Sequence, residues 1–228
     1  MPRETLTREQ IIGTAIDLLD EQGLDGLNMR ELGKRLDAAA TAMYWHVRNK
    51  DNLVRLATDE VWAEIELPDL DALDWRAAAE LLATGMYTML NRHPWIVQAQ
   101  AGYLLYGPNK SRHDEHVLTV YERAGFDDDA ADRAAATVFM FVLGNAVGAA
   151  ANISIERRLG RNGGDPEAKL SEAMSEATAV AMEFPRLRAR IERQAATDYN
   201  AAPDSSFEFG LAALLQGLQD QLADRETP

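Results

Sequence analysis

The sequence predicts an all-α protein. The alternation of apolar and polar residues that is typical of strands is nowhere sustained. Alanine and leucine, two strong helix formers, dominate the chain. Apolar residues recur at helical spacing, as Ile12, Ile16 and Leu19 do near the N-terminus. We expect a three-helix unit at residues 1–50, a connecting helix at 51–66 and a larger helical domain at 67–228.

The three-helix unit carries clear helix start and stop signals. Thr7 and Gln10 have capping-box spacing and begin a helix that stops before Gly23, which suits the left-handed position after a helix. Asn28 and Glu31 begin the second helix in the same way. The predicted helices run to about Gln22, from about Met29 to Leu36, and from about Ala40 to Val47.

Prolines and glycines divide the rest of the chain. Pro94, Pro166 and Pro203 occupy positions that suit the first turn of a helix, and Asp127 can cap a long one. The tract around Gly163 has the composition of a flexible connection. The predicted helices of this part lie near 51–66, 74–92, 95–102, 110–125, 128–158, 166–184, 186–198 and 204–224.

Composition narrows the class of protein. The chain has 228 residues, 46% of them hydrophobic, and no cysteine, which excludes disulfides and thiolate metal sites. The polar N-terminus has no apolar signal region, and we expect a cytoplasmic protein. The apolar stretch 134–155 approaches membrane-spanning length but includes Asn145 and Asn152 and has no aromatic belt. It is therefore interpreted as a buried helix of a bundle, with no membrane partner.

Charge is distributed unevenly along the chain. The formal net charge is −14, which would disfavour nucleic-acid binding if it were spread evenly. From Gly26 to Arg55, however, six basic residues stand against three acidic ones, whereas from Leu56 onward 15 basic residues stand against 28 acidic ones. Only the N-terminal tip is locally positive, so only this tip should approach DNA.

The second and third helices have the form of a helix-turn-helix. Asp37 lies in the turn between them, where positive φ is often needed and Asp tolerates it better than most residues. Met43 and Val47 should face the small core, as should Ala40. A helix with aromatic residues on its outer face suits a DNA groove, although the aromatic residues could also be ordinary packing, and Trp45 could brace the helix. The side chains that point outward are Thr41, Ala42, Tyr44, Trp45 and His46.

Each of these residue types can make a recognised contact with DNA. Thr41 and Ala42 can contact base edges and a thymine methyl, and Tyr44 and His46 can donate to phosphates. Lys50 begins the next helix, where its charge and the free backbone N–H groups can hold a phosphate. The predicted DNA-binding residues are Arg30, Ala40, Thr41, Ala42, Tyr44, Trp45, His46 and Lys50.

The first 55 or so residues resemble the N-terminal domain of TetR-family transcriptional regulators. The matching motifs are Gly23–Leu27, Met29–Leu32 and above all Met43–Leu53, which is similar to the YWHVKNK signature of the tetracycline-repressor subgroup. Looser matches follow at Asp74–Arg76, Arg92–Trp95, Gly107–Asn109 and Ala124–Phe126.

The resemblance implies an all-helical homodimer with an N-terminal helix-turn-helix DNA-binding domain and a C-terminal ligand-binding and dimerisation domain. Such a protein binds a palindromic operator and releases it when a small-molecule inducer enters the larger domain. Asp37 departs from the glycine usual in the turn. Ala40, Thr41 and Ala42 differ from the tetracycline repressor's base-contacting residues, so the operator should differ as well.

Dimerisation is expected because one recognition helix covers only a few base pairs and two-fold symmetry supplies the second half-site. The long helix 128–158 is rich in small residues that permit close helix approach, and helix 204–224 carries an apolar stripe. The alternative is that both stripes belong to the core of one chain. The predicted interface residues are Ala135, Gly144, Gly148, Phe207, Leu211, Leu214, Leu215 and Leu218.

An effector pocket needs apolar walls and a few polar groups. Asn145 stands out among the candidates, because a buried amide must find partners. The same residue types form any hydrophobic core, so a core role remains the alternative for each. No histidine could be matched to the one through which the tetracycline subgroup holds its magnesium–drug complex, so no cofactor, metal or tetracycline is predicted. The predicted pocket residues are Met86, Tyr87, Leu90, His93, Trp95, Tyr103, Leu104, Phe139, Met140, Leu143 and Asn145.

Two other functional interpretations remain at this stage. His113 and His116 have the spacing of metal ligands, which would suit a helical-bundle metal protein or enzyme, but no second cluster completes the site. A solvated helix face explains the pair better. A small-molecule sensor without DNA binding is the other alternative, and the intact run Tyr44–Lys50 argues against it. We therefore expect a non-enzymatic, ligand-responsive repressor in which a moving helix 51–66 changes the spacing of the recognition helices.

Overall fold

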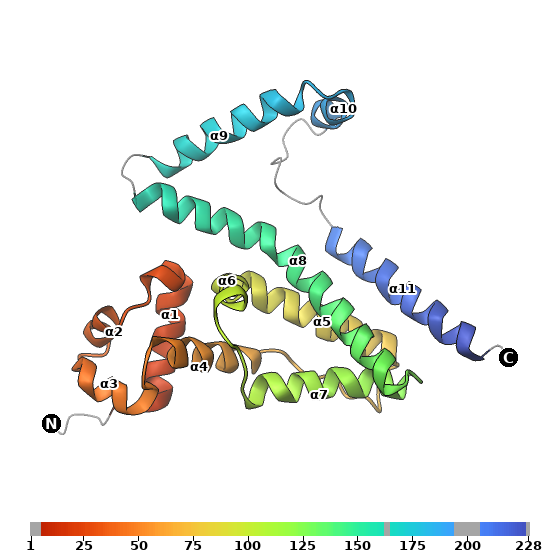
Figure 1. Cartoon of the computed structure of the whole chain (residues 1–228), viewed down its shortest axis with the longest axis horizontal. Coiled ribbons are helices and arrows are strands. Elements are labelled where there is room, and N and C mark those ends of the chain that lie inside the picture. Colours follow the sequence, from red (N-terminus) through yellow and green to blue (C-terminus); the bar gives the residue numbers. More distant parts are fainter. Residues whose placement is uncertain (1–5, 162–164, 194–205, 227–228) are drawn as a thin grey trace. The chain divides into compact units, whose positions relative to one another are not determined.

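A computed structural model of the chain describes residues 6–161, 165–193 and 206–226. The described residues form α-helices joined by turns and contain no strand, which confirms the predicted fold class (Figure 1). The helices are α1 Arg8–Gly26, α2 Met29–Arg35, α3 Ala40–Val47, α4 Lys50–Trp62, α5 Trp75–Arg92, α6 Trp95–Gly102, α7 Pro108–Arg123, α8 Asp128–Arg161, α9 Pro166–Ala181, α10 Pro185–Arg193 and α11 Ser206–Glu226.

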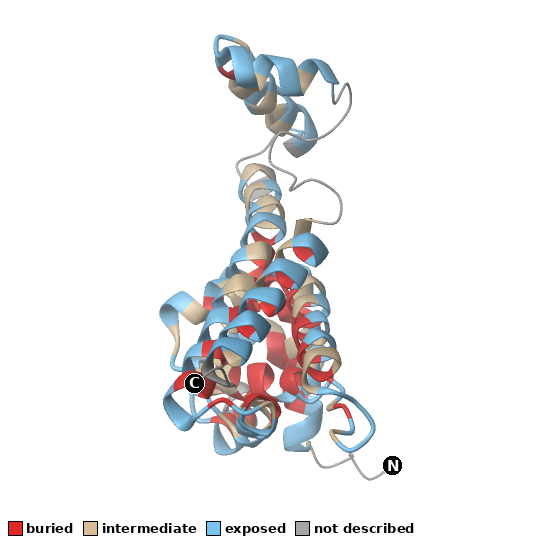
Figure 2. Ribbon diagram, turned by 90° about the vertical axis from the view of Figure 1, so that its right-hand side faces the viewer, coloured by how far each residue is buried: buried red, intermediate tan, exposed pale blue. Residues whose placement is uncertain are grey.

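The chain divides into two compact units, each described here by itself. The first comprises residues 1–146 and 207–228, and therefore contains α1 to α7, the first half of α8 and almost all of α11. Its buried residues gather where these helices meet (Figure 2). The second unit, residues 147–206, contains the end of α8 together with α9 and α10. It buries little, Ala150 and Ala181 being its fully buried apolar residues among those described.

Helix α1 begins as the sequence predicts. The Thr7 side chain accepts a hydrogen bond from the backbone of Gln10, whose own side chain accepts one from the backbone of Thr7. Gly23 has φ 70°, the left-handed conformation expected of it, but one further helical turn follows and ends at Gly26. Gly23 is thus a kink within α1 rather than its end.

Helix α4 is shorter than predicted. It ends at Trp62 instead of near Glu66, and three successive turns carry the chain through Ala63, Glu64 and Ile65. These turns bury Ile65. They also place Glu64 beside Arg92, the last residue of α5, and beside His93, which follows it. Pro68 alone would have allowed the helix to continue for another turn, so tertiary packing decides where it ends.

The prediction that the apolar stretch 134–155 is a buried helix is wrong for the single chain. Only 28% of the most apolar window of α8 is buried, and Met140 and Val147 are exposed. Among the described residues, α8 is also the one helix long and apolar enough to cross a membrane by length and composition. An exposed apolar face of this kind marks a site where another surface packs.

Most other boundaries agree with the prediction to within two residues. Helix α9 ends at Ala181, three residues before its predicted end, and α8 ends at Arg161, three residues after its predicted end. Residues 194–198 of the predicted tenth helix, the predicted break at Pro203 and the tract around Gly163 lie outside the described residues.

Candidate DNA-binding surface and effector cavity

The turn between α2 and α3 has the geometry of a helix-turn-helix. Asn28 caps α2 by accepting a 2.8 Å hydrogen bond from the backbone of Glu31. Asp37 has φ 46°, the positive value predicted for the turn. Gly33 lies so close to the chain that an added Cβ would stand 2.8 Å from the carbonyl oxygen of Ala38. The turn is therefore tight, and α3 is held in a defined position against α2.

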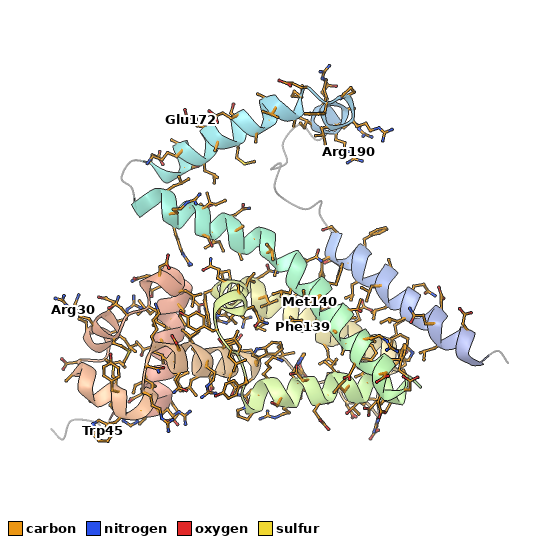
Figure 3. All side chains as sticks on the ribbon, in the orientation of Figure 1. Arg30, Trp45, Phe139, Met140, Glu172 and Arg190 are labelled. Atoms are coloured by element: carbon orange, nitrogen blue, oxygen red, sulfur yellow. The ribbon has the colours of Figure 1, made fainter. Side chains whose placement is uncertain are left out.

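Helix α3 presents its aromatic residues to solvent. Met43 and Val47 are completely buried, whereas Tyr44 is 47% exposed and Trp45 is 89% exposed. Trp45 projects from the outer side of α3 (Figure 3). It therefore does not brace the helix within this chain, which answers the alternative that the sequence left open. Ala42 and His46 are also exposed, while the side chains of Ala40 and Thr41 lie outside the described ones.

The basic residues near α3 differ in their exposure to solvent and in their existing hydrogen bonds. Arg30 is exposed on α2, and Arg48 is exposed directly after α3. Lys50 is half-buried, and its Nζ donates a 2.8 Å hydrogen bond to the carbonyl oxygen of Leu24. The predicted phosphate contact of Lys50 thus competes with a contact that ties the start of α4 to the end of α1.

Ion pairs inside the domain reduce the charge available to DNA. Lys34 pairs with Glu31 at 3.1 Å, and Arg35 pairs with Glu21. The count of charged residues from Gly26 to Arg55 could not reveal the pair of Arg35 with Glu21, because Glu21 lies outside that segment of sequence.

A cavity of about 290 Å³ lies between α5, α7 and α8. Its walls are mostly apolar, and its polar lining groups come from α7 and the start of α8. This volume is at the lower end of the range for pockets that hold drug-sized molecules. The lining residues are Ala79, Leu82, Ala83, Met86, Lys110, His113, Asp114, Val117, Leu118, Val120, Tyr121, Asp132, Ala135, Ala136, Val138, Phe139 and Val142.

Of the predicted pocket residues, Met86 and Phe139 line this cavity and the others do not. Leu104 and Met140 are instead largely exposed, and Leu90 is fully buried in the core. Asn145 satisfies its amide by donating to the carbonyl oxygen of Phe141, one turn earlier in α8. The prediction selected aromatic and polar residues near the right helices, but the face that each one occupies is decided by packing. Tyr103 and Leu143 are partly buried. The ring of Tyr87 stacks on that of Phe207, with the ring centroids 4.0 Å apart.

The two histidines of α7 point to different places. His116 makes a 2.9 Å hydrogen bond with the carbonyl oxygen of Pro68. His113 is buried against the ring of Trp62, with the ring centroids 4.8 Å apart. The interpretation of this pair as a solvated helix face is therefore wrong for His113. No group of three or more metal-ligating side chains occurs in the described part of the chain.

His93, predicted for the pocket, instead joins α1 and the turns after α4 to the C-terminus of α5. Its Nδ1 lies 2.8 Å from Asp20 of α1, and its Nε2 lies 3.1 Å from Glu64 after α4. Trp95 donates from its indole nitrogen to the same oxygen of Asp20 at 2.7 Å. Burial lowers the pKa of His93, but the bonds to Asp20 and Glu64 outweigh it and raise the pKa above its ordinary value.

We expect this cluster to make stability depend on pH. Because the folded protein holds the proton more tightly than the unfolded chain, the contribution is complete below pH 6.5 and is lost as pH rises through the raised pKa. His93→Gln should flatten the stability curve in that window, as measured by urea unfolding at a series of pH values. His116→Gln is the matched control. A pH dependence in the His93 variant that equals that of the wild type would contradict the assignment.

A second joint links α4 to α7. The carboxylate of Asp59 is nearly buried, and one of its oxygens accepts hydrogen bonds from the backbone N–H groups of Asn109 and Lys110, both at 3.0 Å. Asp59 therefore caps the N-terminus of α7 from another helix. Arg55, one turn earlier, donates to the carbonyl oxygen of Tyr106 at 3.1 Å and covers its ring. Sequence spacing gave no signal of this cap.

The predicted dimer residues differ in how far a single chain buries them. Phe207, Leu211, Leu215 and Leu218 are buried within one chain, which favours the alternative of an intramolecular core for them. Ala135 lines the cavity and Leu214 is partly buried. Gly144 and Gly148 are exposed, and a Cβ added at either would meet nothing within 4 Å. The apolar residues that remain uncovered include Met140, Val147 and Phe209.

A helix-turn-helix with exposed aromatic residues, joined to a helical body that contains a cavity, defines a DNA-binding transcriptional regulator that responds to a small molecule. Comparison with known proteins agrees. Residues 11–57 match the family model for bacterial regulatory proteins of the tetR family, and residues 67–222 match the tetracyclin repressor-like C-terminal domain. The chain therefore belongs to the TetR family, which consists of regulators rather than enzymes.

Individual relatives support the same assignment. The tetracycline repressor protein class A from transposon 1721 of Escherichia coli is 33% identical over 91% of this chain and 88% of its own length. An HTH-type transcriptional regulator of Saccharopolyspora erythraea is 36% identical over 61% of this chain, a match that spans 59% of that relative. The crystal structure of Streptomyces coelicolor ActR with actinorhodin superposes with a TM-score of 0.71 at 25% identity, covering 96% of this chain and 97% of ActR.

Proposed function

We propose that the chain is a cytoplasmic repressor whose homodimer binds a palindromic operator and leaves it when an effector enters the cavity between α5, α7 and α8. Its domains would be the predicted ones, residues 1–50, 51–66 and 67–228. The operator contacts would come from Arg30, Ala40, Thr41, Ala42, Tyr44, Trp45, His46 and Lys50. Two relatives, the E. coli tetracycline repressor and ActR bound to actinorhodin, support this combination of repression and small-molecule response.

One observation carries the DNA-binding proposal. Trp45 and Tyr44 are exposed on a helix whose other face, at Met43 and Val47, is completely buried. The part of each ring that stays in water, most of Trp45 and about half of Tyr44, adds nothing to the stability of the domain. They suit a surface that is covered by DNA.

The direct test is a gel-shift titration with DNA from upstream of the chain's own gene, at low and at moderate salt. Retardation that weakens as salt rises is expected, because phosphate contacts release counterions. Absence of any retardation at low salt would favour the alternative of a sensor that does not bind DNA. The metal-protein alternative has little support, because His113 and His116 face different surroundings.

The link between α7 and α4 supplies a route from the cavity to DNA. Lys110, His113 and Asp114 line the cavity on α7, and Lys110 is also one of the two residues capped by Asp59. A shift of α7 on effector binding would therefore displace α4, whose first residue is bonded to α1. Because the two recognition helices of a dimer must stay in register, a displacement of a few ångströms would weaken operator binding.

Dimerisation through the uncovered apolar residues of α8 and α11 leads to a further prediction. Phe209 on α11 is 79% exposed, and Met140 on α8 is 61% exposed. Phe209→Arg should raise the dimer dissociation constant by about a hundredfold or more, because it would bury an unpaired charge in each half of the interface. Light scattering after size-exclusion chromatography measures the change. Leu81→Arg, at an exposed leucine of α5, should leave the dimer unchanged, and a dimeric Phe209 variant would exclude this surface.

A further inference from the structure

The cavity between α5, α7 and α8 contains a buried histidine that has no hydrogen-bond partner among the described residues. Both ring nitrogens of His113 are buried, and neither makes a hydrogen bond within the described part of the chain. The nearest carboxylate oxygen, on Asp114, lies 3.7 Å from Nδ1, which is too long for a hydrogen bond. A buried polar group without a partner destabilises a folded protein, so its presence requires an explanation.

The position of His113 points to a ligand. The residue lines the cavity together with the apolar Val117, one turn further along α7, and Phe139 on α8. The ring is held from behind by Trp62 of α4, at 4.8 Å between centroids. A neutral imidazole offers one donor and one acceptor, and a hydroxyl group can satisfy either.

The charges around the cavity limit the kind of ligand. Lys110 is paired with Asp114, and its Nζ also lies near the rings of Trp62 and Phe139. Burial would raise the pKa of Asp114, but the hydrogen bond and the charge of Lys110 lower it below its ordinary value, so this carboxyl is ionised. Asp132 then adds a further carboxylate to the lining. The lining carries more negative than positive charge, which disfavours an anionic ligand.

We propose that His113 is the polar anchor of the effector, and that the effector is an uncharged or cationic aromatic compound carrying a hydroxyl group. This proposal rests on the proposed function, in which the cavity is the effector site. The apolar walls hold the ring system, and the hydroxyl group forms the hydrogen bond that His113 lacks. His113 thus lowers the stability of the free protein and provides a hydrogen bond to the ligand.

Calorimetric titration of the full-length protein with three two-ring probes tests the proposal. We expect 2-naphthol to bind about tenfold more tightly than naphthalene, the difference of one buried hydrogen bond, and more tightly than 2-naphthoate. His113→Phe should reduce 2-naphthol affinity to the level of naphthalene and leave naphthalene affinity unchanged. His113→Asn, which keeps a donor and an acceptor, should retain most of the preference.

A second measurement needs no ligand. Removing an unsatisfied buried group should stabilise the free protein, so His113→Phe should raise Tm by about 2–4 °C. If His113 had an ordinary structural role, the same substitution would instead destabilise the protein and lower its Tm. A fall in Tm would therefore overturn the proposal, as would equal affinity of the wild type for 2-naphthol and naphthalene, or absence of binding by 2-naphthol.

Val117→Trp separates failure of this proposal from failure of the proposed function. Its larger side chain should fill the cavity and abolish binding of 2-naphthol. If Val117→Trp abolishes binding but His113→Phe does not weaken it, the cavity remains the ligand site and His113 is not its anchor. If Val117→Trp leaves 2-naphthol affinity unchanged, the ligand lies elsewhere and the proposed effector site itself is wrong.

Discussion

Replacing Tyr44 by alanine should weaken operator binding by about a hundredfold while leaving the dimer intact. Each DNA contact of this kind contributes about 1–3 kcal/mol, and the dimer loses it twice because both half-sites are affected. Tyr44 is 47% exposed and does not belong to the core, so the fold should tolerate the change. A fluorescence-anisotropy titration with labelled operator DNA measures the loss of affinity.

Phe184→Ala is the matched control for this substitution. Phe184 is also an aromatic residue exposed by about half, at 55%, but it lies in the second unit and outside the helix-turn-helix. Its replacement should leave operator affinity within about twofold of the wild type. Trp45→Ala extends the test, since Trp45 is 89% exposed and has no packing role to lose. If Tyr44→Ala and Trp45→Ala both bind the operator normally, α3 is not the DNA-contacting helix.

The second large effect is expected at Gly107, directly before α7. A Cβ added there would clash with the carboxyl carbon and both oxygens of Asp59, the side chain that caps α7. The φ of Gly107 is 166°, an extended value open to any residue, so the requirement for glycine comes from this close approach alone. Gly107→Ala should lower the free energy of unfolding by about 2–4 kcal/mol, through loss of the cap and overpacking.

Urea unfolding measures this loss, and a double-mutant cycle shows its cause. Asp59→Ala alone should cost about 1–2 kcal/mol, the usual effect of removing a cap. The double variant should be no less stable than Asp59→Ala, because the carboxyl group that clashes is no longer present. Gly102→Ala, where an added Cβ meets nothing within 4 Å, is the control and should change little. Additive effects of the two substitutions would show that Gly107 does not act through Asp59.

The same variants test the route from cavity to DNA. Asp59→Ala should bind the effector with nearly unchanged affinity, because Asp59 does not line the cavity. The effector should, however, displace this variant from the operator less completely, since α7 and α4 are no longer joined by the cap. Operator affinity measured with and without saturating effector gives the coupling directly. Full displacement of the variant would remove Asp59 from the mechanism.

Local signals in the sequence were sufficient for the helix-turn-helix. The capping box at Thr7, the cap at Asn28 and the spacing of Met43 and Val47 all depend on residues within a few positions of one another. The same spacing separated the buried face of α3 from its exposed face. Short-range hydrogen bonds and helical periodicity determine these features, and both can be recognised without knowledge of the rest of the fold.

Periodicity was not sufficient for the cavity or for the ends of longer helices. It showed that Tyr87, Leu90 and Met140 belong to helices, but not that Tyr87 stacks on Phe207, that Leu90 enters the core and that Met140 remains exposed. A buried aromatic or apolar residue looks the same in sequence whether it faces a neighbouring helix or an empty space. Only the positions of the neighbouring helices distinguish the two.

The sequence by itself determined an all-α regulator with a DNA-binding N-terminal unit, because helix formation, capping and the positive tip depend on nearby residues. The tertiary structure decided which residues meet across long separations. His93 binds Asp20 and Glu64, and Asp59 caps α7. His113, at the cavity wall, has no hydrogen-bond partner in the part of the chain that the structure describes. These contacts follow from how whole helices pack, since residues distant in sequence approach only when the hydrophobic core brings their helices together.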